Sequence, residues 1–402
     1  MSDTQAPAIS VLVPIYNVEP YLRQCLQSIC NQDFSDFEVI CINDGSTDGS
    51  LSIIEEFVQN DKRFTVIDKP NSGYGHSMNC GLDKARGRYI AILESDDFYE
   101  PFALSTLYNE AISTEADVVK ANFYFYWSDA EKAFRRASDA HLLTKLESKE
   151  ADFLASGSNA QMTNDSEAYA HTEHAELFSW VQEGDPSLTR PLEYVDVFYR
   201  KPSIWSALYR KDFLFDHNIR FLETPGASFQ DTSFTFKVWL HAQKVALVNE
   251  AVLFYRQDNE TSSVNAPGKL YCVCDEYDEI VRACEQERSP EISKILNPVI
   301  AKMRFDTYMW NYERVVEDLQ KEFLVRMQKD FASEDAQGVV DLDYFEPYKQ
   351  IQRTDIVKRP LHFHAYHKAA QENLGFCAKL IQYYRIGGVS LLMRIVKDRL
   401  RG

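Results

Sequence analysis

The chain has 402 residues, too many for one small core, and its 45% hydrophobic and 26% charged content is ordinary for a soluble globular protein. The formal charge of −18 argues against nonspecific nucleic-acid binding, which requires a basic surface. An acidic protein can still bind an anion that a metal ion bridges to it. The start of the chain does not resemble a signal peptide, and no apolar run reaches the roughly 20 residues that span a bilayer, so we expect a cytoplasmic protein.

Apolar strands and amphipathic helices alternate over residues 1–125. Buried strands are predicted at ISVLVPIY, FEVICIND, FTVIDK, RYIAILES and ADVVKANF. Helices are predicted between them, at about residues 20–30, 51–60, 75–85 and 101–112. This alternation predicts an α/β fold of Rossmann-like type, in which a mainly parallel central sheet has helices on both faces.

The pattern changes after residue 125. Residues 126–192 are polar and weakly periodic, and we interpret them as an insertion. Order resumes over 193–267, where TSFTFKVWLHA predicts a helix and KVALVNEAVLFY a strand. The remainder, 268–402, is an α-helical C-terminal region. We therefore expect one domain over 1–267, made of two halves and the insertion, followed by the helical region.

Acidic residues follow two of the predicted strands. Asp44 comes after the second strand, and the sequence ESDD, residues 94–97, ends the fourth. Ligands bind at the carboxyl ends of strands in open parallel sheets, so both groups should lie at one ligand-binding edge. Taken alone, ESDD is more typical of a solvated loop or of an N-cap for the helix that starts at Pro101. Carboxylates that converge on one edge also suit Mg²⁺, which combines one or two protein carboxylates with substrate phosphates.

Four stretches in this order resemble inverting family 2 glycosyltransferases of the GT-A fold. They are ISVLVPIYNVEPYLRQCLQSICNQ, FEVICINDGSTDGS, KPNSGYGHSMNCGLDKARGRYIAILESDDFYEP and SFQDTSFTFKVW, and the resemblance covers roughly residues 9–265. It implies metal-dependent transfer of a sugar, expected from a UDP-linked donor, to a saccharide or glycolipid hydroxyl in cell-surface polysaccharide synthesis. It also implies that residues 1–125 form the nucleotide-binding half and residues 193–267 the acceptor and catalytic half.

The resemblance implies a donor site at the predicted edge. A proline and a tyrosine would line and stack on the base, and an aspartate would accept a hydrogen bond from uracil. A glycine-containing turn and helix would reach the ribose and diphosphate, and an arginine on a mobile loop would contact the diphosphate. The implied donor-binding residues are Pro14, Tyr16, Asn17, Asp44, Gly45, Gly73, Gly75, Asn79, Ser95, Asp96 and Arg256.

A metal ligand, a base and acceptor contacts are implied as well. Asp97 would coordinate Mn²⁺ or Mg²⁺, and Asp231 would be the general base that accepts the proton of the acceptor hydroxyl. Gln230 and Trp205 would lie at the acceptor site, although Trp205 can equally be a core aromatic residue. Asp231 can also serve as the N-cap of the helix that follows it. The chain departs from the family in having Glu94 where Asp is commoner, Gln230 in place of Glu, and no metal-binding histidine in YRQDNETSSV.

Two other functions remain open at this stage. A catalytically inactive sugar-binding or scaffold protein would account for Gln230 and for the missing histidine. A sugar nucleotidyltransferase shares the architecture but needs a basic glycine-rich loop after the first strand, where this chain has VPIYNVEP. The basic amphipathic stretch over residues 389–400 predicts a peripheral contact with the inner face of the membrane, or a helix docked on its own domain or on a second subunit in a homodimer.

Overall fold

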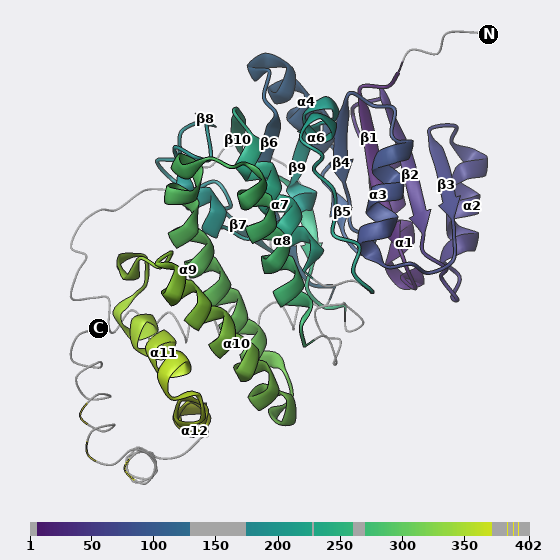
Figure 1. The fold of residues 1–402 in the computed structure, drawn as a ribbon. Coiled ribbons are helices and arrows are strands. Elements are labelled where there is room, and N and C mark those ends of the chain that lie inside the picture. The colour runs from purple at the N-terminus through teal and green to yellow at the C-terminus, as the bar shows by residue number, and fades with distance from the viewer. Residues whose placement is uncertain are drawn as a thin grey trace, which may run out of the picture. The chain divides into compact units, whose positions relative to one another are not determined.

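The structure, a computed structural model, describes residues 6–128, 174–226, 229–259 and 270–371, together with residues 384, 389 and 393. The chain divides into two compact units, Met1–Asn265 and Ala266–Gly402. Figure 1 shows both units coloured along the chain. Within the described residues, the first unit is a mixed α/β domain and the second is helical, which confirms the predicted fold class.

The first half of the first unit alternates strands and helices as predicted. All seven residues of β1 and all seven of β2 are buried, which explains their uninterrupted apolar sequences. The buried residues of α1 are Leu22, Cys25, Leu26 and Ile29, four of the positions that helical periodicity selects. The elements are β1 (Ile9–Ile15), α1 (Glu19–Cys30), β2 (Phe37–Asn43), α2 (Ser50–Asn60), β3 (Phe64–Asp68), α3 (Tyr74–Lys84), β4 (Tyr89–Ile92), β5 (Phe98–Tyr99), α4 (Ala103–Thr114) and β6 (Val118–Tyr126).

The second half of the unit completes the same sheet. Its elements are β7 (Ala175–Phe178), β8 (Leu188–Thr189), η1 (Val195–Tyr199), η2 (Ile204–Ser206), β9 (Ala207–Arg210), α6 (Lys211–Asp216), α7 (Gln230–His241) and β10 (Val245–Arg256). The strand order is β3-β2-β1-β4-β9-β6-β10-β5, with β7 paired to β6 and β8 to β10. Within the described part of the insertion, β7 and β8 therefore extend the main sheet.

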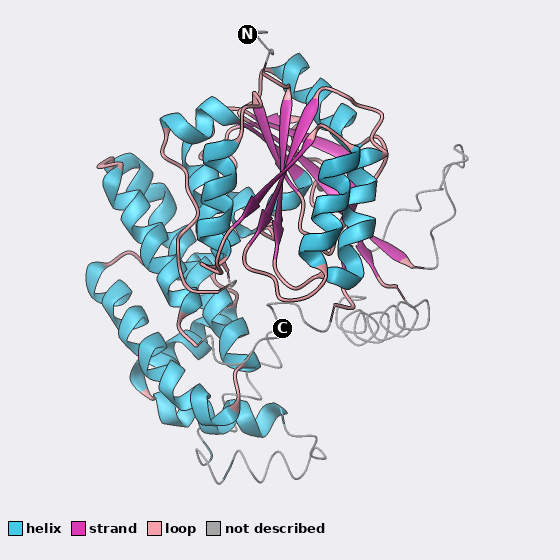
Figure 2. Cartoon of the chain, turned by 90° about the vertical axis from the view of Figure 1, so that its right-hand side faces the viewer, coloured by secondary structure: helices cyan, strands magenta, loops and turns pink. Residues whose placement is uncertain are grey.

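The sheet is parallel over its first four strands and mixed beyond them. β2 pairs in parallel with β1 and β3, and β1 with β4. β9 then lies between β4 and β6 and runs antiparallel to both, while β6 and β10 are parallel. Figure 2 shows helices on both sides of these strands. Because β1, β2 and β4 run in the same direction, their carboxyl ends share one edge, as predicted.

The second unit consists of helices in its described part. They are α8 (Cys272–Gln286), α9 (Pro290–Arg314), α10 (Glu317–Gln337), η4 (Leu342–Tyr344), α11 (Pro347–Lys358) and α12 (Pro360–Gln371). Buried aromatic rings of α9 and α10 form much of its core, with the Tyr308 and Phe331 rings stacked 5.9 Å apart. Among the described helices of the whole chain, none has the length and apolar character needed to cross a membrane. The predicted amphipathic stretch 389–400 lies outside the described residues except for Val389 and Met393.

Candidate active site

Asp44 organises the turn between β3 and α3. Its Oδ1 accepts hydrogen bonds from the Ser72 backbone N–H, at 2.8 Å, and from the ammonium of Lys69. Its Oδ2 accepts a 3.0 Å hydrogen bond from the Gly73 N–H. Gly73 has a φ of +90°, and a Cβ on Gly45, whose φ is +71°, would lie 2.7 Å from the Asn71 nitrogen. Backbone geometry therefore requires glycine at both positions, since side chains rarely adopt these conformations.

The segment after β1 is tied to the segment after β2. The Asn17 N–H donates to Ser46 Oγ at 3.0 Å, and Asn17 Oδ1 accepts from the Thr47 N–H at 2.7 Å. Pro14 is buried within β1, whereas the Tyr16 side chain is 53% exposed at the carboxyl edge. An exposed ring on a fixed backbone is available to stack on a planar ligand. The predicted donor contacts of these residues stay predictions.

Two of the predicted donor residues contact the segment that precedes α7. A Cβ on Gly75 would lie 2.0 Å from the Leu222 carbonyl oxygen. The Asn79 side chain donates to the Phe221 carbonyl at 3.0 Å and to Glu223 Oε1 at 2.9 Å, and it accepts from the Phe221 N–H at 3.0 Å. Gly75 and Asn79 thus join α3 to the segment that leads to Asp231, and the Asn79 amide is occupied by that structural role.

The ESDD residues make three different contacts. Glu94 Oε1 accepts a 2.6 Å hydrogen bond from the Tyr74 hydroxyl, and Asp96 Oδ2 accepts one of 2.8 Å from the Asn259 side chain. Asp97 is fully buried, and its Oδ1 accepts a 2.8 Å hydrogen bond from the Arg256 N–H. Asp97 Oδ2 is buried without a hydrogen-bond partner among the described residues. Ser95 lies between them with 9% exposure.

Burial dominates the electrostatics of this motif. It raises the pKa of Asp96, and it raises that of Asp97 well above its usual range with a further contribution from Asp96. Burial, with smaller contributions from Asp96 and Asp231, raises the pKa of Glu94 to about 8. The motif therefore holds protons more tightly than exposed carboxylates do.

The unsatisfied oxygen bears on the predicted metal. A buried carboxylate oxygen without a donor is costly, and a bound cation would satisfy it. Among the described residues, no three His, Cys, Asp or Glu side chains lie close enough together to enclose a metal ion. This donor set fits Mg²⁺ or Mn²⁺ bound through one or two carboxylates with the remaining positions filled by substrate or water. Asp97 offers the unpaired oxygen, and Asp96 is the more exposed of the two.

Asp231 approaches this motif from a distant part of the chain. It lies in the first turn of α7, whose N-cap is Phe229 in the left-handed conformation with a φ of 62°. The alternative that Asp231 caps the helix is therefore wrong. Burial raises its pKa to about 6, and the charge of Lys201 opposes this shift. Since Asp231 in turn raises the pKa of Glu94, the base candidate and the acid motif belong to one electrostatic site.

The Arg256 side chain is held by contacts within the protein. Its guanidinium donates to the Asp96 carbonyl at 2.9 Å, to Gln24 Oε1 at 2.7 Å and to Ser128 Oγ. It also lies over the Tyr21 ring at 4.7 Å. These contacts, together with its 5% exposure, give Arg256 a structural role at the end of β10. A contact between Arg256 and the diphosphate stays a prediction.

The two predicted acceptor residues are buried in the described structure. Trp205 is 6% exposed and packs on the Tyr255 ring at 4.7 Å, and its Nε1 has no described hydrogen-bond partner. Gln230 is 2% exposed and donates to Thr224 Oγ1 at 2.9 Å. Both residues are held by contacts within the protein, and their acceptor contacts stay predictions.

Lys201 and Tyr74 are site residues that sequence reasoning missed. Lys201 Nζ lies 5.2 Å from the Tyr255 ring centroid, and Asp231 and Asp97 both counteract the lowering of its pKa by burial. Its ammonium makes no ion pair or hydrogen bond with the described residues. Lys201 precedes Pro202 in a segment with no motif, so no spacing rule identifies it. Tyr74 lay inside a quoted motif, but its hydroxyl contact depends on the fold.

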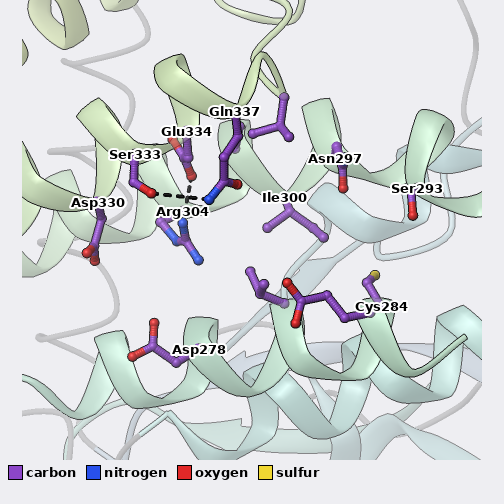
Figure 3. Close-up of a pocket in the computed structure, with 14 residues that line it drawn as sticks. Asp278, Cys284, Ser293, Asn297, Ile300, Arg304, Asp330, Ser333, Glu334 and Gln337 are labelled. Carbon is purple, nitrogen blue, oxygen red and sulfur yellow. Dashed lines mark hydrogen bonds and ion pairs between the residues drawn. The ribbon is translucent and has the colours of Figure 1, made fainter. Parts of the chain in front are cut away.

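A separate cavity of about 350 Å³ lies in the helical unit, lined by residues of α8, α9 and α10 (Figure 3). Three of its acidic residues bond to arginines of the same unit. Arg304 bonds to Glu334 at 2.8 Å, and Arg326 bridges Asp278 at 2.7 Å and Asp330 at 2.6 Å. This cavity contains no arrangement like that of the acids and Asp231, so the carboxyl edge of the sheet is the candidate active site.

The chain is similar to known glycosyltransferases. Residues 10–165 match the family described as Glycosyl transferase family 2. The uncharacterized glycosyltransferase EpsJ of Bacillus subtilis (strain 168) is 30% identical over 270 residues, which cover 65% of this chain and 64% of EpsJ. Glycosyltransferase GlyA of Streptococcus pneumoniae serotype 4 is 41% identical over 118 residues, which cover 29% of this chain and 17% of GlyA. The chain thus spans less than two thirds of either relative.

Among solved structures, S. aureus TarS in complex with UDP-GlcNAc aligns with a TM-score of 0.62 at 19% identity, over 91% of this chain and 93% of that chain. At this identity the likeness concerns the fold. The sheet order and the TarS likeness define the class, a GT-A domain with a helical C-terminal region. Residues 10–165 are similar to glycosyl transferase family 2, and EpsJ extends the similarity to a relative named as a glycosyltransferase over 65% of the chain.

Proposed function

We propose that this chain is a metal-dependent, inverting glycosyltransferase that moves a sugar from a UDP-sugar to a hydroxyl of a saccharide or lipid-linked saccharide. One observation carries the proposal: Tyr74 bonds both to the segment that leads to Asp231, through the Gly226 carbonyl at 2.9 Å, and to Glu94 of the ESDD motif at 2.6 Å. Inverting transfer needs a base on the acceptor side and charge stabilisation on the donor side. Asp231 supplies the first, and the acid motif offers the place for the second.

The donor half of the proposal rests on the edge formed by β1 and β2. The exposed Tyr16 ring can stack on a base, and base stacking contributes about 1 to 3 kcal/mol. Asp44, whose carboxylate fixes the Gly73 turn, would accept a hydrogen bond from the edge of the base. TarS is recorded with UDP-GlcNAc, which favours a UDP-sugar among nucleotide sugars.

The chemical step follows from the placement of Asp231. With a pKa of about 6, its carboxylate is ionised at neutral pH and can accept the proton of an acceptor hydroxyl. The acceptor oxygen then forms a bond to the anomeric carbon as the bond from that carbon to the diphosphate breaks. Because the attack comes from the face opposite the leaving group, the configuration inverts. The products are the extended saccharide and UDP.

Asp97, with Asp96 beside it, would hold Mn²⁺ or Mg²⁺ through the oxygen that lacks a partner. A divalent cation there would supply charge neutralisation for the departing diphosphate. The protein's own contribution is to fix the carboxylates. The Arg256 N–H holds Asp97 Oδ1, and the Asn259 side chain holds Asp96 Oδ2.

A panel of nucleotide sugars, assayed with Mn²⁺ for donor hydrolysis and for transfer, tests the proposal. UDP release from one or more UDP-sugars is expected, and the Asp231→Asn variant should release less. Binding without release would favour the sugar-binding or scaffold alternative. Formation of a nucleotide sugar from a sugar phosphate and a nucleoside triphosphate would instead favour the nucleotidyltransferase alternative.

The proposed acceptor also bears on where in the cell the enzyme acts. A lipid-linked saccharide would be met at a membrane surface, and the basic amphipathic stretch 389–400 could bring the enzyme there. Peripheral association with the inner face of the membrane is therefore part of the proposal. A homodimer formed through the C-terminal helices is the competing use of the same stretch.

A further inference from the structure

Tyr74 and Glu94 link two segments of the candidate site directly. The Tyr74 hydroxyl donates a 2.6 Å hydrogen bond to Glu94 Oε1, across 20 positions of sequence. Tyr74 is the first residue of α3 and follows Gly73, whose N–H is held by Asp44. Glu94 opens the ESDD motif. The bond therefore connects the turn held by Asp44 with the acids that follow β4.

Tyr74 is also fixed on its other side. Its backbone N–H donates to the Gly226 carbonyl at 2.9 Å, and its ring meets the Phe221 ring edge-on at 5.9 Å. Both partners precede α7, which carries Asp231. One tyrosine thus contacts the donor-side turn, the acid motif and the segment that leads to the base.

The length of Glu94 matches this contact. An aspartate, the commoner residue of the family at this position, is shorter by one methylene, or about 1.5 Å. On the same backbone its oxygen would lie about 4 Å from the Tyr74 hydroxyl, beyond hydrogen-bond range. The departure from the family pattern at Glu94 therefore has a structural reason in Tyr74.

The environment makes the contact specific. Burial, and then the neighbouring Glu94 carboxylate, raise the pKa of Tyr74 well above its usual range, so its hydroxyl keeps the proton that it donates. Loss of either partner would destabilise the folded site, because both groups are partly buried and water would replace the missing bond incompletely. The pair is thus a fixed contact of the folded site.

We infer that Tyr74 and Glu94 form a positioning pair that sets the separation between the Gly73 turn and Asp96–Asp97, so that Glu94 serves the donor site through Tyr74 and does not itself bind the donor or the cation. This inference rests on the proposed function, since it assumes that a nucleotide binds at this edge. It gives Glu94 a positioning role that is separate from the roles proposed for Asp96 and Asp97.

Four variants test the pair: Tyr74→Phe, Glu94→Asp, Glu94→Gln, and the double variant Tyr74→Phe/Glu94→Asp. Calorimetry with UDP and Mn²⁺ measures nucleotide affinity, and hydrogen–deuterium exchange measures the opening of amides over residues 73–79. Tyr108→Phe is the matched control. It removes a tyrosine hydroxyl from the same unit, and no hydrogen bond of that hydroxyl is described. Thermal unfolding of each variant establishes that it is folded.

Tyr74→Phe and Glu94→Asp should each weaken UDP binding about 3- to 10-fold, the usual range for one lost hydrogen bond. The double variant should be no weaker than either single variant, because both remove the same bond. Glu94→Gln should retain most of the affinity, since its amide oxygen can still accept from Tyr74. Amides 73–79 should exchange faster in the first two variants and not in Tyr108→Phe.

The opposite pattern would overturn the inference. If Glu94→Gln abolished UDP binding while Tyr74→Phe bound normally, Glu94 would be a direct ligand. If the wild-type protein bound no UDP, the proposed donor would be wrong, and exchange over residues 73–79 would still decide on the pair. Unchanged exchange in both Tyr74→Phe and Glu94→Asp would exclude it.

Discussion

The backbone N–H of Arg256, the last residue of β10, donates a 2.8 Å hydrogen bond to Asp97 Oδ1 across 159 positions of sequence. This bond fixes the acid motif to the far half of the sheet while Asp97 Oδ2 lacks a described partner. One oxygen of the carboxylate is thus structural, and the other is available to a cation. The effects of substitution at Asp97 should separate accordingly.

Asp97→Asn should abolish the metal-dependent part of UDP binding. The amide can still accept from Arg256, but it places a neutral group where the free oxygen lies. Calorimetry should give the variant the same UDP affinity with and without Mn²⁺. That affinity should be at least about 10-fold weaker than the affinity of the wild-type protein in Mn²⁺. Asp96→Asn is the companion variant, which measures how much Asp96 contributes to metal-dependent UDP binding. Unchanged UDP affinity of Asp97→Asn in Mn²⁺ would remove Asp97 from the metal site.

Asp231→Asn should lower transfer by roughly 10²- to 10⁴-fold, because asparagine is nearly isosteric but cannot accept the proton. Donor binding should persist, since the proposed role of Asp231 is on the acceptor side. Single-turnover transfer and UDP calorimetry on the same preparation separate the two effects. Transfer close to wild type would mean that another group is the base.

Transfer should fall as the pH drops through about 6, where Asp231 takes up a proton and stops acting as a base. Lys201→Met removes the positive charge that opposes this rise in pKa, so the acidic limb of the kcat profile should move to higher pH. Lys201→Arg keeps the charge and should leave the limb near its wild-type position. Superimposable kcat–pH profiles for Lys201→Met and the wild-type protein would exclude an electrostatic role of Lys201.

Glu94 should make the metal-free protein less stable as the pH rises. Its pKa is raised from 4.5 to about 8, so the folded state holds this proton more tightly than the unfolded state. The resulting stabilisation is complete below about pH 4.5 and is lost as the pH rises through about 8.

Glu94→Gln removes this dependence. Between about pH 5 and 8 its free energy of unfolding should fall less steeply than that of wild type, by up to about 1.4 kcal/mol per pH unit. Urea unfolding at a series of pH values measures both slopes. Parallel plots of the free energy of unfolding against pH for the two proteins would show that Glu94 has the same pKa in the folded and unfolded states.

The stretch 389–400 should bind anionic membranes. Each of its basic residues, Arg394, Lys397, Arg399 and, just beyond, Arg401, can contribute about 1 kcal/mol at an anionic surface. The full-length protein should co-sediment with anionic vesicles at low salt, and a version that ends at Gly388 should stay in the supernatant. Equal behaviour of the two versions would favour the dimer contact.

Local sequence patterns were sufficient to predict the strands and helices that carry the candidate site. Apolar runs and helical spacing predicted β1, β2, β3, β4 and β6 with the helices between them, because side-chain periodicity reflects burial directly. The position of Asp44 and of Glu94–Asp97 at one edge followed as well. Each residue comes just after an apolar strand, and parallel strands bring their carboxyl ends to the same side.

The tertiary structure alone decided which partners these residues have. The insertion of antiparallel β9 between β4 and β6, the Tyr74–Glu94 bond and the approach of Lys201 to Tyr255 all join segments far apart in the sequence. The donor contact predicted for Arg256 stays a prediction, and only the fold shows that its guanidinium bonds to Gln24, Ser128 and the Asp96 carbonyl. Periodicity reports how deeply a residue is buried. The chain path and the reach of each side chain determine which groups meet, and those depend on the packed fold as a whole.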